Sequence, residues 1–286
     1  MRIGTIIHKG EETAALVLDG AALPVTSLGK PWPADLLGLL TTGAFHELKR
    51  WYDDQSAASL AKLGPWVPAG DVRFAPLLRR PRKIWCIGLN YRDHAADLSE
   101  TAPTAEPASF MKPDTTIIGP GETILLPKLS NRVTGEAELG LVFGAQCRHV
   151  ERDAWSSVLA GYTTIVDMTA EDILRRNPRN LTQCKSFDTF LSIGPVLVTP
   201  DEIAGISKVR VRTVHNGKVH AENTIDRMTF PPDYLVWYHT QIMTFLPGDI
   251  LSSGTPGAAV LAEGDTIACE IDGFPTLTNP VHDLKA

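Results

Sequence analysis

The chain has 286 residues, 43% of them hydrophobic and 21% charged, which is enough apolar material to bury a sizeable core. Its 27 Lys and Arg residues against 33 Asp and Glu residues give a formal net charge of −6, so no basic field is available and no nucleic-acid partner is expected. No apolar run approaches the roughly 20 residues that a membrane helix needs, so no membrane association is expected either.

The N-terminal pattern and the cysteines indicate a cytoplasmic protein. The apolar start of the chain meets Lys9, Glu11 and Glu12 before a signal-peptide core can form. The four cysteines are widely spaced and include no C-x-x-C pair, which argues against a disulfide framework or a zinc knuckle. Reduced thiols are therefore expected.

The first part of the chain, residues 1–75, is expected to form a small α+β domain. Residues 2–7 and 13–18 have the short apolar runs of strands on either side of a turn. Residues 33–61 carry apolar side chains at helical spacing. A stretch rich in proline and glycine, residues 64–70, then indicates a linker.

Residues 76–286 are predicted to form a larger, mainly β domain with a few covering helices. Asn216-Gly217 and Asp272-Gly273 are dipeptides typical of tight hairpin turns. Neither glycine-rich phosphate-binding pattern occurs, which argues against a doubly wound nucleotide-binding fold. Strands are expected at 84–89, 136–143, 162–167, 196–198, 209–215, 266–271 and around residue 250, and helices at 154–160, 170–176 and 233–245.

Three carboxylates could hold a metal ion. Glu136 and Glu138 share one face of a strand because residues two apart point the same way, and their charges repel unless a cation lies between them. An all-oxygen set suits Mg²⁺, Mn²⁺ or Ca²⁺ better than zinc. Taken alone, such a pair is more often a solvated strand edge. Asp167 ends an apolar strand, where it needs a partner or else caps the next helix.

His94 and Asp97 could form a general base. If the chain turns helical after Asn90, the two side chains lie one turn apart, and the carboxylate would orient the imidazole and raise its basicity. The spacing alone favours an ordinary surface helix with mixed charges. Lys185 could neutralise a substrate anion or be solvated, and the turn at Gly254 could offer backbone N–H groups or be only a turn.

Taken together, these segments resemble the fumarylacetoacetate hydrolase family. The resemblance covers about residues 80–286, and the first 75 residues look like the small N-terminal domain of many bacterial members. The blocks that carry it, in order, are Gly88-Leu89-Asn90-Tyr91-Arg92-Asp93-His94, Phe110-Met111-Lys112-Pro113, Gly119-Pro120-Gly121, Glu136-x-Glu138, Gly161-Tyr162-Thr163, Asp167, Lys185-Ser186-Phe187-Asp188-Thr189-Phe190, Gly194-Pro195, Pro247-Gly248-Asp249 and Gly254-Thr255-Pro256.

The resemblance implies a mixed β-roll catalytic domain, usually in a homodimer, with Mg²⁺ or Mn²⁺ (or Ca²⁺) as cofactor. The residue roles that it implies are metal ligation by Glu136, Glu138 and Asp167, catalysis by His94 with Asp97 and by Lys185, and substrate contacts from Tyr91, Arg92, Gly254 and Thr255.

The resemblance also implies a small 2-oxo acid or 1,3-dicarbonyl compound as substrate. The first expectation is a metal-dependent hydrolase that cleaves a C–C bond in an acylpyruvate, such as a fumarylpyruvate- or fumarylacetoacetate-like compound, with water activated by His94 and a metal-stabilised enolate. The alternative is a decarboxylase or an isomerase or tautomerase of a 2-oxo or 2-hydroxymuconate-type acid in aromatic catabolism. A non-catalytic protein that binds 2-oxo acids is a third hypothesis.

Two positions depart from the family pattern. Glu171 stands where members often have an arginine that contacts the substrate, and Leu174 stands where glutamine is common. Either Arg175 or Arg176 takes over that contact, or the substrate differs from the usual diacids. The second interpretation predicts that Glu171→Arg improves turnover of a dicarboxylate.

Overall fold

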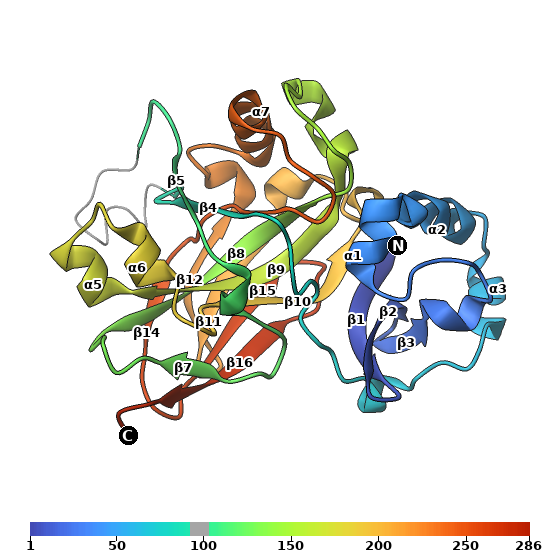
Figure 1. Ribbon diagram of the computed structural model, residues 1–286, viewed down its shortest axis with the longest axis horizontal. Coiled ribbons are helices and arrows are strands. Elements are labelled where there is room, and N and C mark those ends of the chain that lie inside the picture. Colours follow the sequence, from blue (N-terminus) through green and yellow to red (C-terminus); the bar gives the residue numbers. More distant parts are fainter. Residues whose placement is uncertain (92–102) are drawn as a thin grey trace.

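The computed structural model describes residues 1–91 and 103–286, and the described residues form two β-sheets with helices around them (Figure 1). The strands are β1 (Arg2–His8), β2 (Glu11–Leu18), β3 (Ala21–Pro24), β4 (Ile84–Gly88), β5 (Ala108–Met111), β6 (Ile117–Ile118), β7 (Ile124–Leu126), β8 (Val133–Phe143), β9 (Leu159–Ala170), β10 (Leu191–Val198), β11 (Arg210–His215), β12 (Lys218–Thr224), β13 (Ile250–Ser252), β14 (Ala258–Leu261), β15 (Thr266–Ile271) and β16 (Leu277–Asp283).

The helices are short. The α-helices are α1 (Leu36–Thr42), α2 (Ala44–Asp53), α3 (Ala57–Lys62), α5 (Glu171–Arg176), α6 (Leu181–Lys185) and α7 (Pro232–Ile242). Single turns of 3₁₀ helix occur at Val25–Leu28, Ala69–Asp71, Asp114–Thr116, Pro200–Glu202, Ile206–Lys208 and Ile225–Arg227, and a longer one at Arg152–Val158.

The larger sheet is built around the long strands β8 and β9. Its strand order is β3-β2-β1-β10-β9-β8-β13-β4-β5, with β14 paired to β8 and β6 paired to β10. β8 and β9 are antiparallel, and Glu136 lies opposite Asp167 in their register. On the other side of β9, a Cβ on Gly161 would be 2.3 Å from the carbonyl oxygen of Val198, so this close approach to β10 requires glycine.

The smaller sheet covers one face of β8. Its strand order is β12-β11-β15-β16-β7, and Ala137 and Leu139 of β8 share a hydrophobic core with Ile267 of β15. Because side chains alternate along a strand, Glu136 and Glu138 must point to the opposite face of β8. The fold therefore places both carboxylates away from the main core.

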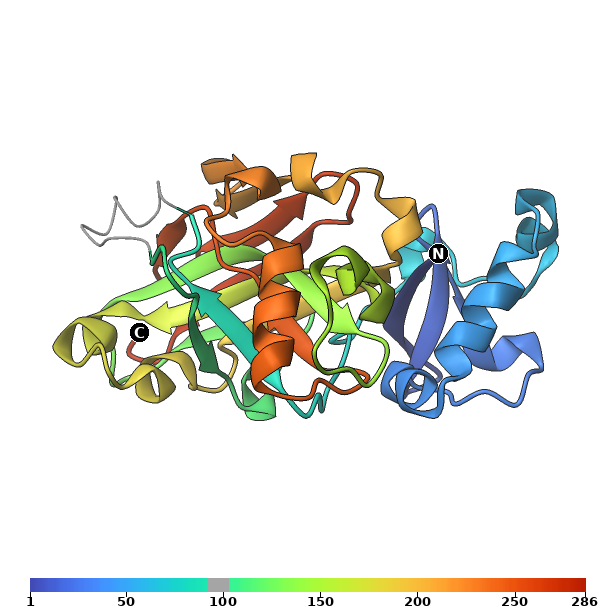
Figure 2. The same ribbon diagram turned by 90° about the horizontal axis from the view of Figure 1, so that it is seen from above.

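The N-terminal strands continue the larger sheet, because β1 pairs antiparallel with β10. Leu40 of α1 and Leu48 of α2 pack in one core with Ile165 of β9 and Ile193 of β10. Figures 1 and 2 both show this part at one end of the molecule and α5 and α6 at the other. The division near residue 75 stays a prediction, and the parts before and after that position share a sheet and a core.

The mainly β, α+β class predicted from the sequence is confirmed. Asn216-Gly217 joins β11 to β12, with positive φ at both residues (51° and 73°), and Asp272-Gly273 joins β15 to β16. The helix expected at 154–160 is wrong: the 3₁₀ helix ends at Val158 and β9 begins at Leu159. There the apolar run is buried between two neighbouring strands, and this pairing outweighs its helical spacing.

Candidate metal centre and its cavity

The three predicted metal ligands come together on the β8–β9 pair. Ligand oxygens of Glu136, Glu138 and Asp167 all lie within 4.8 Å of one another. The register explains this, because Glu136 is directly opposite Asp167 and Glu138 follows two residues along the same face. Asp167 is fully buried, Glu138 is 1% exposed, and the Glu136 side chain is 12% exposed.

Glu138 is held in place by the end of β13. Its Oε2 accepts hydrogen bonds from the hydroxyl of Ser252 and from the backbone N–H of Gly254, the latter at 2.9 Å. Burial, together with the charges of Asp167 and Glu136, raises the pKa of Glu138 to about 8. Three carboxylates packed this closely therefore need positive charge beside them.

Two lysines supply part of that charge. The Lys185 ammonium lies 2.9 Å from Glu136 Oε2 and 2.9 Å from Asp167 Oδ2. Lys112 lies 2.5 Å from Asp167 Oδ1 and also donates to the carbonyl oxygens of Met168 and Phe190 at 2.9 and 2.8 Å. Burial alone would lower the pKa of Lys185, but the charges of Asp167 and Glu136 raise it overall. Burial lowers the pKa of Lys112 despite the neighbouring Asp167.

The donor set fits a hard divalent cation. Glu136, Glu138 and Asp167 offer only carboxylate oxygens, which Mg²⁺, Mn²⁺ and Ca²⁺ prefer. Three carboxylates against Lys112 and Lys185 leave one negative charge uncompensated in a buried place. A divalent ion would reverse that sign and make the centre attractive to an anionic substrate.

The carboxylates open into a cavity of about 470 Å³. Lys185 and Thr255 line it, as does Glu136. Thr255 is fixed by its neighbours, since its hydroxyl donates to the carbonyl oxygen of Gly257 and accepts from the N–H of Gly257. The cavity therefore combines two of the three predicted ligands, Glu136 and Glu138, with two of the residues expected to act on a substrate.

Other predicted site residues are placed differently. His94, Asp97 and Arg92 lie outside the described residues. Tyr91 is fully buried, its hydroxyl has no hydrogen-bond partner among the described residues, and it is not part of the cavity wall. Gly254 also lies outside the wall and instead donates its N–H to Glu138. Its φ of 92° and a Cβ position 2.8 Å from Asn90 Cβ explain why glycine is needed there.

Sequence reasoning missed several residues that build the centre. Lys112 lies in a block that carries the family resemblance, but nothing in its spacing indicated that it would reach Asp167. Asn90 binds the Phe230 and Ser253 carbonyl oxygens at 3.0 and 2.8 Å and accepts from the Phe230 N–H at 2.9 Å. These contacts cross at least 140 positions of sequence, so only the folded chain reveals them.

The departing residue Glu171 lines the same cavity, and so does Leu174. Glu171 accepts hydrogen bonds from Arg132 Nε and from a terminal nitrogen of Arg175, the latter at 2.5 Å. Both arginines also line the cavity, whereas Arg176 does not. Of the two arginines considered from the sequence, the structure therefore favours Arg175 as the cation beside the site.

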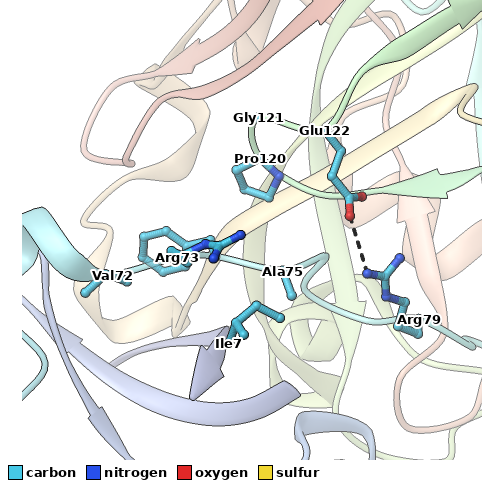
Figure 3. Close-up of a pocket in the computed structure, with 9 residues that line it drawn as sticks. Ile7, Val72, Arg73, Ala75, Arg79, Pro120, Gly121 and Glu122 are labelled. Carbon is cyan, nitrogen blue, oxygen red and sulfur yellow. Dashed lines mark hydrogen bonds and ion pairs between the residues drawn. The ribbon is translucent and has the colours of Figure 1, made fainter. Parts of the chain in front are cut away.

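A second hollow, of about 600 Å³, lies where β1 meets the segments 72–79 and 120–122 (Figure 3). Its charged feature is an ion pair between Arg79 and Glu122, 3.5 Å apart. None of the predicted site residues lines it, and the cavity at Glu136 is therefore the candidate active site. Among the described residues, no helix is long and apolar enough to cross a bilayer.

The chain is similar to known proteins over most of its length. Residues 83–282 match the family model described as "Fumarylacetoacetate (FAA) hydrolase C-terminal". The human mitochondrial oxaloacetate tautomerase FAHD2A is 34% identical over 232 residues, which cover 78% of this chain and 74% of that protein.

Two solved structures have the same architecture. The 2-hydroxyhepta-2,4-diene-1,7-dioate isomerase from Mycobacterium marinum has a TM-score of 0.78 and 28% identity, with both chains fully covered. The fumarylacetoacetate hydrolase from Exiguobacterium antarcticum has a TM-score of 0.84 and 25% identity, with 99% of each chain covered. The β-roll fold expected from the resemblance is thereby confirmed.

Proposed function

Because the chain belongs to the fumarylacetoacetate hydrolase family, we propose that it is a divalent-metal-dependent enzyme that converts a 2-oxo acid through its enolate. The observation that carries this proposal is the carboxylate group of Glu136, Glu138 and Asp167, of which the two glutamates line a cavity together with Lys185. Mg²⁺ or Mn²⁺ is the proposed cofactor, with Ca²⁺ as an alternative.

The proposed division of labour follows from the positions of these residues. A divalent ion bound by the three carboxylates would supply Lewis-acid polarisation of the substrate's keto oxygen. The Lys185 ammonium, whose pKa is raised, remains protonated and faces the cavity, where it can stabilise negative charge that develops on the substrate. Thr255 lies on the same wall, and its hydroxyl could bind a substrate oxygen by turning its proton away from the carbonyl oxygen of Gly257.

The first candidate reaction is hydrolytic C–C cleavage of an acylpyruvate. His94, oriented by Asp97, would take a proton from water, whose oxygen forms a bond to the distal carbonyl carbon. The C–C bond then breaks, and its electron pair becomes the enolate of the 2-oxo acid, which takes up the proton from His94. The products are a 2-oxo acid and a carboxylic acid.

A second candidate, tautomerisation or isomerisation of a 2-oxo acid, uses the same residues without water attack. It is favoured by the 34% identity to an oxaloacetate tautomerase and the 28% identity to a 2-hydroxyhepta-2,4-diene-1,7-dioate isomerase. Decarboxylation of such an acid, as in aromatic catabolism, would follow the same enolate chemistry. A protein that only binds 2-oxo acids is the third hypothesis, and any metal-dependent turnover would eliminate it.

We also propose that the enzyme is a cytoplasmic homodimer. The dimer rests on the family resemblance, and the location rests on the four free cysteines. Light scattering on the purified protein should give twice the mass of the chain, and a monomer mass at micromolar concentration would contradict it.

The test is to mix the purified protein and Mg²⁺ or Mn²⁺ with fumarylpyruvate and, separately, with enol oxaloacetate, and to follow the products by NMR. Pyruvate plus fumarate, lost with EDTA, would establish the hydrolase. Faster conversion of enol to keto oxaloacetate, with no cleavage of fumarylpyruvate, would establish the tautomerase. A carbon skeleton shortened by carbon dioxide would indicate a decarboxylase, and no metal-dependent turnover of either compound would contradict the proposal.

A further inference from the structure

A row of polar side chains along the two central strands leads to a pair of arginines that lie just beyond them. On β8 the row runs from Glu136 to Thr134 and continues to Arg132, the residue before the strand, and all three line the cavity. On the neighbouring strand it runs from Asp167 through Thr169 to the position of Glu171, whose N–H donates to the carbonyl oxygen of Arg132 at 2.8 Å. Acidic ligands thus occupy one end of the row and two guanidinium groups the other.

We propose that Arg132 and Arg175 bind a second, remote carboxylate of the substrate, and that Glu171 is the positioning residue that holds both arginines. This inference rests on the proposed function, in which the first carboxylate and the keto oxygen of a 2-oxo acid bind near Glu136, Glu138 and Asp167. The substrate class that it names is the dicarboxylic 2-oxo acids.

The charge and hydrogen-bond inventory supports an anion site rather than a simple surface ion pair. Glu171 is buried, with 8% of its side chain exposed, whereas Arg132 and Arg175 are 44% and 63% exposed. Within this group of three residues, the Glu171 carboxylate neutralises only one of the two guanidinium charges, so one positive charge remains. Among the described residues, Arg132 uses only its Nε in a hydrogen bond and Arg175 only one terminal nitrogen, so N–H groups on both remain free to bind an oxyanion.

The spacing and the lining between the two ends suit a carbon chain. Arg132 directly precedes β8 and is four residues from Glu136, which in extended chain corresponds to about 13 Å between their Cα atoms. The cavity wall also includes Leu174, Leu181 and Phe110, which offer no charge. A molecule with two acidic ends and an uncharged middle therefore matches the cavity better than one with a single acidic end.

The pairing also reverses the expectation for Glu171→Arg. In the sequence analysis, the interpretation that the substrate differs from the usual diacids predicts that this change improves turnover of a dicarboxylate. In the structure, a third arginine would replace the carboxylate that, among the described residues, orients both Arg132 and Arg175, and the three cations would repel one another. We therefore expect weaker binding of a dicarboxylate in that variant.

The test compares two stable ligands that differ only at the remote end, 2-oxoadipate and 2-oxohexanoate. Calorimetric titration of the Mg²⁺-loaded protein should show at least tenfold tighter binding of 2-oxoadipate. Arg132→Gln and Arg175→Gln should each remove most of that preference while leaving 2-oxohexanoate affinity unchanged. Glu171→Gln should reduce the preference and Glu171→Asp should retain it, because only the aspartate keeps a charge that can orient the arginines.

Arg176→Gln is the matched control, because Arg176 lies on the same helix but outside the cavity wall, and the preference should survive there. Unchanged 2-oxohexanoate affinity shows that a variant is folded. Equal affinity of the wild type for both ligands would overturn the inference and leave the proposed function standing. So would a preference that survives in both Arg132→Gln and Arg175→Gln. If neither 2-oxo acid binds, the proposed function is contradicted as well.

Discussion

The two lysines at Asp167 differ in what they can do. Lys112 is fully enclosed, with none of its side chain exposed, and it is absent from the cavity wall. Lys185 pairs with the same carboxylate but lines the cavity, within reach of a bound molecule. Lys112 is therefore the positioning cation of the centre, and Lys185 is the one available for chemistry.

Removal of the enclosed cation should destabilise the fold. In Lys112→Met, Asp167 loses one of its two ion pairs, and the carbonyl oxygens of Met168 and Phe190 lose their donor. We expect the free energy of unfolding to fall by about 3–5 kcal/mol, as for other broken buried pairs. Urea denaturation of the metal-free protein measures it.

The control for that experiment is Lys208→Met. Lys208 also forms an ion pair, with Asp226, but its side chain is 80% exposed, so its loss should cost no more than about 1 kcal/mol. A similar decrease in the free energy of unfolding of both variants would show that burial does not give Lys112 a special role.

Glu138 should be indispensable for metal binding. Glu138→Gln keeps the shape of the side chain but removes the charge from one of the two buried ligands. We expect Mn²⁺ affinity to fall at least 100-fold and metal-dependent turnover to vanish. Calorimetric titration with Mn²⁺ measures the metal affinity, and the NMR assay measures the turnover.

Glu151→Gln serves as the matched control, because Glu151 is exposed and does not line the cavity. It should bind Mn²⁺ like the wild type. Metal affinity retained in Glu138→Gln, or turnover without metal, would contradict the assignment of the carboxylates.

At the scale of elements, the sequence predicted which strands carry the ligands but not how they meet. Alternation along a strand was sufficient to place Glu136 and Glu138 on one face. The register that sets Asp167 opposite Glu136 depends on pairing between strands far apart in the chain, and no local pattern encodes it. The same reason explains why Lys112 and Arg132 were not identified as part of the centre.

Three elements meet at Asn90, just after β4, and this residue should couple fold stability to the metal centre. Its side chain joins the segment at Phe230 to the end of β13 at Ser253, next to the Gly254 N–H that binds Glu138. Asn90→Ala would leave buried backbone groups without partners and should cost about 2–4 kcal/mol of stability. Denaturation curves and Mn²⁺ titration should show both stability and metal affinity reduced.

Asn131→Ala is the control, because that side chain is exposed, and both quantities should stay near wild type there. If Asn90→Ala lowered stability but left metal affinity unchanged, the proposed coupling through Gly254 would be wrong.

For the whole molecule, composition and strand patterning were sufficient to predict the fold class. The order of the short sequence blocks was sufficient to predict the family. The sheet order was not predictable, since it requires contacts such as β1 against β10, whose paired residues are 192 or more positions apart in the sequence. The sequence predicted a domain boundary near residue 75, but residues before and after that position share a hydrophobic core. Local patterns define elements, and burial between distant elements decides how they assemble.

Metal binding should stabilise the whole chain, because the ligands come from two central strands that unfold with the rest. An ion that binds only the folded state adds about 2.7 kcal/mol when its concentration is 100 times Kd. For a chain of 286 residues that corresponds to a rise in Tm of about 4–5 °C. Thermal unfolding followed by circular dichroism should show this rise with Mn²⁺ and its reversal by EDTA. Glu138→Gln should show no rise, because the site that links the ion to the two strands has lost one of its three ligands. An equal rise in that variant would place the stabilising ion elsewhere on the molecule.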